Sequence, residues 1–101
     1  IPTDDRYLFV TMTKEKKEII ISFRDSGGGI KEEVIDKIFE PYFTTKHQSK
    51  GTGLGLYMTH QIITKHLEGI ICAENSEYEY NGKKLKGAEF IITLPMSNNP
   101  R

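Results

Sequence analysis

Gly51-Thr52-Gly53-Leu54-Gly55-Leu56-Tyr57 organises the chain, because three alternating glycines run directly into a helical pattern. Glycine tolerates positive φ and lets a ligand approach the backbone, so successive N–H groups can turn inward around an anion. The helix that follows adds unpaired first-turn amides and the positive end of its dipole. A phosphate group fits such a cradle. On its own, however, this motif more often marks an ordinary loop that enters a helix, so the rest of the sequence decides.

Length and composition indicate one small soluble domain. The chain has 101 residues, of which 37% are hydrophobic and 28% charged, and fourteen basic residues balance fourteen acidic ones. A zero net charge disfavours nucleic acid as a partner. No run is long enough to span a membrane and no signal-peptide pattern opens the chain. We therefore expect a cytoplasmic domain, whose parent protein can still carry a membrane anchor. The single cysteine, Cys72, excludes an internal disulfide.

Four segments have the composition of strands and two have that of helices. Strands are expected at residues 7–13, 19–24, 70–74 and 90–94, which are rich in β-branched and aromatic residues. Helices are expected at residues 31–39 and 54–67, which place apolar residues at helical spacing and are ended by Pro41 and Gly69. The first two strands form an antiparallel hairpin. Asn81-Gly82 predicts a tight turn inside the segment 76–87 that links the last two strands.

Polar residues before the glycines of the opening stretch offer further candidate contacts. Asp25 ends a strand and precedes three glycines, so its carboxylate can accept hydrogen bonds from an amine, although an aspartate there can equally cap the next helix. Residues 41–50 form a polar loop in which Lys46 or Lys50 can meet phosphate charge, although lysines in such a loop are more often merely solvated. The three histidines have no spacing typical of a metal site and are interpreted as ordinary surface or half-buried residues.

Three blocks in this order resemble the catalytic ATP-binding domain of sensor histidine kinases, within a superfamily that includes DNA gyrase and mismatch-repair ATPases. Residues 25–29 are similar to the first glycine box, Asp-x-Gly-x-Gly, residues 38–46 to the phenylalanine box and residues 51–56 to the second glycine box. The phenylalanine box favours kinases over gyrase-like ATPases. The resemblance covers about residues 7–95. It implies a single partial domain with the Bergerat-type fold: an α/β two-layer sandwich, incomplete at the N-terminus, with helices on one face of a mixed, largely antiparallel sheet.

The resemblance also implies a site for ATP or ADP. Asp25 is expected to accept the adenine amino group beside Gly29 and Ile30, residues 43–50 to form a short lid, and residues 52–56 to hold the phosphates through backbone amides. The expected nucleotide-binding residues are Asp25, Gly27, Gly29, Ile30, Phe43, Thr45, Lys46, Gly51, Thr52, Gly53, Leu54, Gly55 and Leu56.

One block of the family pattern has no counterpart in this sequence. The family carries an asparagine box, upstream of the first strand pair, whose asparagine binds Mg²⁺. Residues 1–24 read instead as a lead-in and a hairpin, and the asparagines of the chain all lie after Asp25. The helical dimerisation domain that bears the phosphorylated histidine is also missing. We therefore expect no catalytic residue and no metal ligand within these 101 residues, with Mg²⁺ required only in the parent protein.

These features together predict the ATP-binding portion of a two-component histidine kinase. In the parent, the γ-phosphoryl would pass to a histidine on the dimerisation domain and then to a response regulator. The 101-residue chain alone is expected to be inactive and to bind nucleotide weakly or not at all. An uncovered sheet face is expected to make it self-associate, with exchange of an element as one route. Two alternatives stay open: a non-kinase ATPase or anti-sigma-type serine kinase, and a degenerate interaction module that no longer binds nucleotide.

Overall fold

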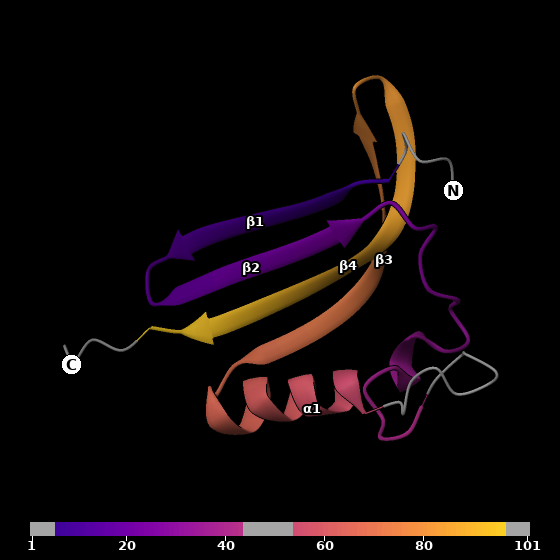
Figure 1. Ribbon diagram of the computed structural model, residues 1–101. Coiled ribbons are helices and arrows are strands. Elements are labelled where there is room, and N and C mark those ends of the chain that lie inside the picture. Colours follow the sequence, from indigo (N-terminus) through magenta and orange to yellow (C-terminus); the bar gives the residue numbers. More distant parts are fainter. Residues whose placement is uncertain (1–5, 44–53, 97–101) are drawn as a thin grey trace.

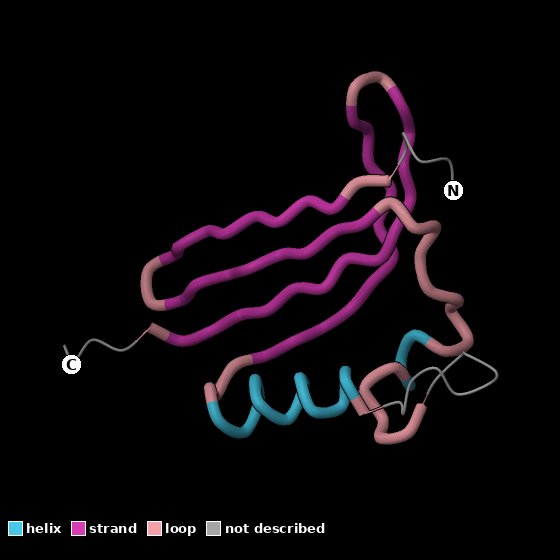
Figure 2. Tube along the Cα trace, viewed as in Figure 1, coloured by secondary structure: helices cyan, strands magenta, loops and turns pink. Residues whose placement is uncertain are grey.

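The computed structural model describes residues 6–43 and 54–96, which form one four-stranded sheet with a helix on one face (Figure 1). The strands are β1 (Leu8–Glu15), β2 (Glu18–Asp25), β3 (Ile70–Tyr80) and β4 (Lys83–Pro95), in the spatial order β1-β2-β4-β3. The helix α1 (Gly55–Gln61) lies beside β3, as Figure 2 also shows. The predicted two-layer α/β arrangement with helical structure on one face is confirmed.

All three strand pairings in the described residues are antiparallel, so the sheet there is not mixed. The first hairpin pairs Leu8 with Asp25 at one end and Glu15 with Glu18 at the other, across a two-residue turn. Residues directly opposite each other share a face, so Phe23, Phe90 and Ala73 form one row across the sheet. The side chain of Asp25 follows Phe23 on this same face because strand side chains alternate.

The last two strands are much longer than expected. The segment 76–87 was predicted to be a linker, but its residues continue the β3–β4 ladder from Ser76 opposite Gly87 to Tyr80 opposite Lys83. Asn81 and Gly82 have φ values of 52° and 77°, which are the left-handed values that a two-residue hairpin turn requires. The predicted turn is therefore confirmed, at the tip of a long curved hairpin that rises above the rest of the sheet (Figure 1).

The second predicted helix exists but is shorter and less regular than expected. α1 ends at Gln61 and a π-helical turn, Ile62–His66, replaces the last part of the predicted segment 54–67. The chain leaves this turn through Glu68, whose φ is 57°. The helical segment thus ends before Gly69, the predicted stop, and the left-handed residue is Glu68. A Cβ atom at Gly69 would lie 2.6 Å from the carbonyl oxygen of Thr93, so glycine is needed there for a close approach to β4.

The first predicted helix, at residues 31–39, is wrong. Three successive turns join Lys31 to Val34, Val34 to Lys37 and Lys37 to Glu40, and only Ile35–Lys37 forms a 3-10 helix. Nine residues bounded by Pro41 give few hydrogen bonds against the cost of nucleation. The backbone of Ile30, directly upstream, is moreover hydrogen-bonded to a side chain of β3. Tight turns still bury Ile38 and bring Phe39 to Phe90 of the sheet.

The core is small and lies between α1, the preceding turns and the β3–β4 half of the sheet. Its buried apolar residues in the described ranges are Ile38, Ile63, Ile71 and Ala88, whereas Leu85 is buried on the opposite face of β4. Within residues 6–43 and 54–96, nothing covers the β1 half of the same face. Leu8, Val10 and Met12 are 65%, 55% and 70% exposed, although they lie opposite Asp25, Phe23 and Ile21. We call these three residues the β1 apolar stripe.

Candidate functional site

The carboxylate of Asp25 is held in place by the strand beside it. Its Oδ1 accepts hydrogen bonds from the backbone N–H groups of Gly27 and Ala88, each at 3.0 Å. Among the described residues no hydrogen bond reaches its other oxygen, Oδ2. Asp25 is half-buried at the end of β2. One oxygen thus fixes the side chain and the other remains available to accept a hydrogen bond from a ligand, as an ionised carboxylate does.

The glycines after Asp25 make a sharp left-handed path. Gly28 and Gly29 both have φ of 95°, a conformation that side chains rarely adopt. Gly27 has no such requirement and instead donates its N–H to Asp25. The expected pattern Asp-x-Gly-x-Gly leaves position 28 unspecified, but the structure shows that Gly28 is one of the two residues that need to be glycine for conformational reasons. The path brings Gly29 and Ile30 to the side of β3.

The β3–β4 hairpin anchors this segment at several points. Tyr78 donates its hydroxyl to the carbonyl oxygen of Asp25 at 2.6 Å, and Gly28 donates its N–H to the carbonyl oxygen of Lys86 at 2.8 Å. A Cβ atom at Gly87 would overlap the backbone of Asp25, so the absence of a side chain lets the segment lie directly against β4. The position of Asp25 therefore depends on residues of the last two strands.

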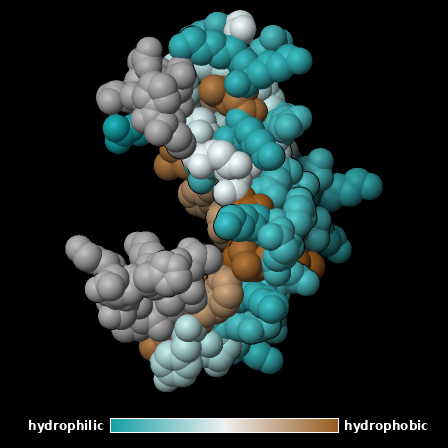
Figure 3. Space-filling model, turned by 90° about the vertical axis from the view of Figure 1, so that its right-hand side faces the viewer, coloured by the Kyte–Doolittle hydropathy of each residue, from teal (hydrophilic) through white to brown (hydrophobic). Residues whose placement is uncertain are grey.

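An apolar hollow lies between α1 and the face of the sheet that carries Asp25. Its volume is about 310 Å³, and it is lined by Phe23, Leu56, Thr59, Ile71, Phe90 and Ile92. Figure 3 shows hydrophobic residues along the hollowed side of the molecule. Ligand sites are typically apolar hollows of roughly this size with a few polar groups at fixed positions. Asp25 does not line the hollow, but it lies two residues beyond Phe23 on the same face and is a polar group at a fixed position.

The other predicted site residues are placed only in part. Leu54 is the residue before α1, Gly55 is its first residue, and Leu56 lines the hollow. Phe43 is half-buried and donates its N–H to the carbonyl oxygen of Glu40. Outside the described residues lie Thr45, Lys46, Gly51, Thr52 and Gly53. The structure thus places Asp25 and Ile30 against the β3–β4 hairpin and Leu56 in the apolar hollow, and the nucleotide contacts of all these residues stay predictions.

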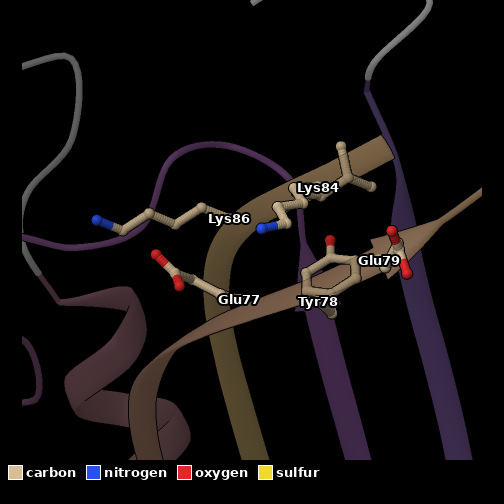
Figure 4. Close-up of a pocket in the computed structure, with 6 residues that line it drawn as sticks. Glu77, Tyr78, Glu79, Lys84 and Lys86 are labelled. Atoms are coloured by element: carbon tan, nitrogen blue, oxygen red, sulfur yellow. The ribbon is translucent and has the colours of Figure 1, made fainter. Parts of the chain in front are cut away.

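A second hollow, of about 460 Å³, lies on the β3–β4 hairpin and carries charges of both signs (Figure 4). The register places Glu77 opposite Lys86 and Glu79 opposite Lys84. Opposite charges facing each other across two strands stabilise a hairpin. We interpret this surface as support for the long hairpin rather than as a ligand site.

Neither a metal site nor a membrane span is present in the described parts of the chain. Within residues 6–43 and 54–96, no three His, Cys, Asp or Glu side chains lie close enough together to hold a metal ion. No helix in these ranges has the length and hydropathy that crossing a membrane requires.

Three residues that matter to the site were missed by sequence reasoning. Asn75 lies on β3 between the predicted strand and the predicted linker, and it contacts Ile30. Tyr78 lies on β3 within the predicted linker, and it contacts Asp25. Gly87 lies in the same stretch. A signal did exist, because Tyr78 and Tyr80 alternate with Glu77 and Glu79 as in a strand with two different faces. Extending the two strands toward Asn81-Gly82 would have brought these residues next to Asp25.

Comparison with known proteins agrees with the fold. Residues 2–98 match the family described as histidine kinase-, DNA gyrase B- and HSP90-like ATPases. Among curated relatives, the two-component sensor PprA of Pseudomonas aeruginosa is 36% identical over 83% of this chain, and the sensor histidine kinase ZraS of Escherichia coli K12 is 40% identical over 87%. The chain spans only 8% and 17% of these two proteins.

Solved structures give the same result. The catalytic domain of the histidine kinase ThkA superposes with a TM-score of 0.66 at 35% identity, over 87% of this chain and 51% of that one. The mycobacterial sensor histidine kinase MprB superposes with a TM-score of 0.69 over 89% of this chain and 56% of that one; at 22% identity it supports the fold alone. The chain therefore belongs to the histidine kinase-, DNA gyrase B- and HSP90-like ATPase family, in which its curated relatives PprA and ZraS are a two-component sensor and a sensor histidine kinase.

Proposed function

We propose that this chain is the ATP-binding portion of a two-component sensor histidine kinase, with Asp25 as the residue that selects adenine. The observation that carries the proposal is the carboxylate of Asp25. Its Oδ1 is held by two backbone N–H groups, and its Oδ2 is available on the face of the sheet that carries an apolar hollow. Adenine presents an exocyclic amino group and an apolar face, which match these two features. In the parent protein, the γ-phosphoryl of ATP passes to a histidine on a separate helical domain and then to a response regulator.

The remaining site residues are proposed on the basis of family membership. Gly27, Gly29 and Ile30 form the base-side wall next to Asp25. Phe43, Thr45 and Lys46 belong to the lid. The residues proposed to hold the phosphates through their backbone amides are Gly51, Thr52, Gly53, Leu54, Gly55 and Leu56. Mg²⁺ has its protein ligand elsewhere in the parent protein.

The test is to titrate ADP into the purified chain by NMR, with and without Mg²⁺, and to repeat it with Asp25→Asn. The amide keeps one oxygen for Gly27 and Ala88 but replaces the free acceptor with a donor, which faces the donor of adenine. We expect the variant to bind ADP at least about tenfold more weakly, since a charge-assisted hydrogen bond is lost. Asp36→Asn, at an exposed turn residue, is the matched control and should bind as the wild type does.

Two results would count against the proposal in different ways. Equal affinities of the wild type and Asp25→Asn would refute the adenine role of Asp25. A wild-type chain that binds no ADP at millimolar concentration would instead favour the degenerate interaction module. The chain alone is expected to show neither autophosphorylation nor magnesium-dependent ATP turnover, and detecting either would contradict its assignment as an inactive portion.

A further inference from the structure

Asn75 makes an unusual set of contacts with the segment that follows the glycines. Its Oδ1 accepts the backbone N–H of Ile30 at 2.7 Å, and its Nδ2 donates to the carbonyl oxygen of the same residue, also at 2.7 Å. Nδ2 further lies 3.2 Å from the carboxylate of Glu32. The side-chain amide therefore satisfies both backbone groups of Ile30, as a neighbouring strand would.

Gly29 is fitted to this contact. A Cβ atom there would lie 2.6 Å from Oδ1 of Asn75 and 3.2 Å from its Cγ. Gly29 thus needs to be glycine both for its φ of 95° and for the approach of Asn75. The pair fixes Gly29 and Ile30, which form one wall of the proposed adenine site, at a set position relative to Asp25.

We propose that Asn75 is a positioning residue for the nucleotide site, because it locks the base-side wall of Gly29 and Ile30 against β3. This inference rests on the proposed function and deepens it. When the base is held between a fixed wall and Asp25, its amino group stays hydrogen-bonded to the Asp25 carboxylate. When the wall moves, the base tilts and that contact is made only part of the time. Asn75 therefore contributes to the preference for adenine without touching the ligand.

The chemistry of the contact allows a sharp substitution. Asn75→Asp has the same shape, but its carboxylate can only accept hydrogen bonds, so it faces the carbonyl oxygen of Ile30 and the carboxylate of Glu32 without a donor. Asn75→Leu removes both hydrogen bonds at similar size and adds no charge. The same change at the hairpin tip, Asn81→Asp, is the matched control, since aspartate is also accepted in this turn.

The experiment measures two affinities for each protein by NMR titration: that for ADP and that for inosine diphosphate, whose base lacks the amino group. In the wild type ADP should bind more tightly. In Asn75→Asp and Asn75→Leu the ratio of the two affinities should fall roughly fivefold, which corresponds to the loss of one hydrogen bond. Added negative charge or partial unfolding weakens both nucleotides alike and leaves the ratio unchanged. Asn81→Asp should keep the wild-type ratio.

Amide hydrogen exchange in the nucleotide-free chain gives a second readout. The N–H of Ile30 should exchange roughly fivefold faster in Asn75→Leu, which removes its acceptor, while the N–H groups that join β2 and β4 keep their wild-type rates. An unchanged affinity ratio, or an unchanged exchange rate at Ile30, overturns the role of Asn75 and leaves the proposed function standing. A wild type that binds no nucleotide, or binds both equally, overturns the role of Asp25 and this inference together.

Discussion

Gly87 is the residue at which β4 makes room for Asp25. A methyl group at this position would overlap the carbonyl group of Asp25, and the flanking residues are held by the β3–β4 ladder. Gly87→Ala should therefore lower the free energy of unfolding by about 2–3 kcal/mol, as overpacking does. Gly55→Ala is the control, because nothing lies within 4 Å of a Cβ there. Chemical denaturation measures both, and equal stability of the two variants would contradict the packing seen at Gly87.

Tyr78, which donates its hydroxyl to Asp25, makes the stability of the fold depend on pH. Burial raises the pKa of its hydroxyl above the ordinary value of 10.0; Arg24 lowers this pKa and Asp25 raises it further. Above about pH 10 the unfolded chain loses this proton while the folded chain keeps it, so stability falls as the pH rises toward the folded pKa and is unaffected below pH 10. The expected result is that Tyr78 ionises above its ordinary pKa, as tyrosinate absorbance would show.

Tyr78→Phe is the matched variant for this titration. It should remove the late-ionising group and lower stability at neutral pH by about 1 kcal/mol, the value of one hydrogen bond. It should also make unfolding less sensitive to alkali. If the absorbance step that Tyr78→Phe removes lies at the ordinary pKa of 10.0, the hydroxyl of Tyr78 does not stay on the carbonyl oxygen of Asp25.

At the scale of elements, the β3–β4 hairpin depends on its two-residue turn. Gly82 has φ of 77°, which costs an alanine about 1 kcal/mol. Gly82→Ala should lower the melting temperature, whereas Gly82→Asn should lower it less, since asparagine accepts left-handed values. Because Gly82 has nothing within 4 Å of a Cβ, the effect is purely conformational. Equal melting temperatures for the two variants would argue against this turn geometry.

Elements that carry a strong local signal could be predicted, and those fixed by distant contacts could not. Asn81-Gly82 predicted its turn because the left-handed requirement is local. The helix predicted at residues 31–39 failed because Asn75, far along the chain, takes the backbone groups of Ile30. Asp25 was found from its position before the glycines. Its partner Ala88 could not be predicted, because the donor is a backbone N–H, which nearly every residue type has.

At the scale of the whole molecule, the β1 apolar stripe is a surface without cover in the described chain. β1 is also an edge strand, so an apolar stripe and unpaired backbone groups coincide there. Edge strands of this kind associate with other strands. We propose a second copy of this chain as the partner, through symmetric antiparallel pairing of two β1 strands. The mass measured by light scattering should then rise with concentration.

Met12→Lys should shift this equilibrium toward the monomer, because it places a charge within the stripe. Thr11→Lys is the control: Thr11 is also exposed on β1, but its side chain points to the opposite face. Both changes should leave stability within about 0.5 kcal/mol, as exposed substitutions do. A wild type that stays monomeric at high concentration would refute self-association, and equal shifts in both variants would argue against the stripe as the contact.

The anchoring of Asp25 by the long hairpin also sets the order in which the molecule can assemble. The contacts of Asp25 with Tyr78 and Ala88 join residues 53 and 63 positions apart. Such distant contacts form slowly, because the entropy of closing a long loop is lost before the contacts can stabilise the chain. During synthesis, β1 and β2 can pair as soon as they emerge, but Asp25 gains its partners only when β4 has left the ribosome. A nascent chain therefore cannot hold the carboxylate of Asp25 in its final position until β4 has been synthesised.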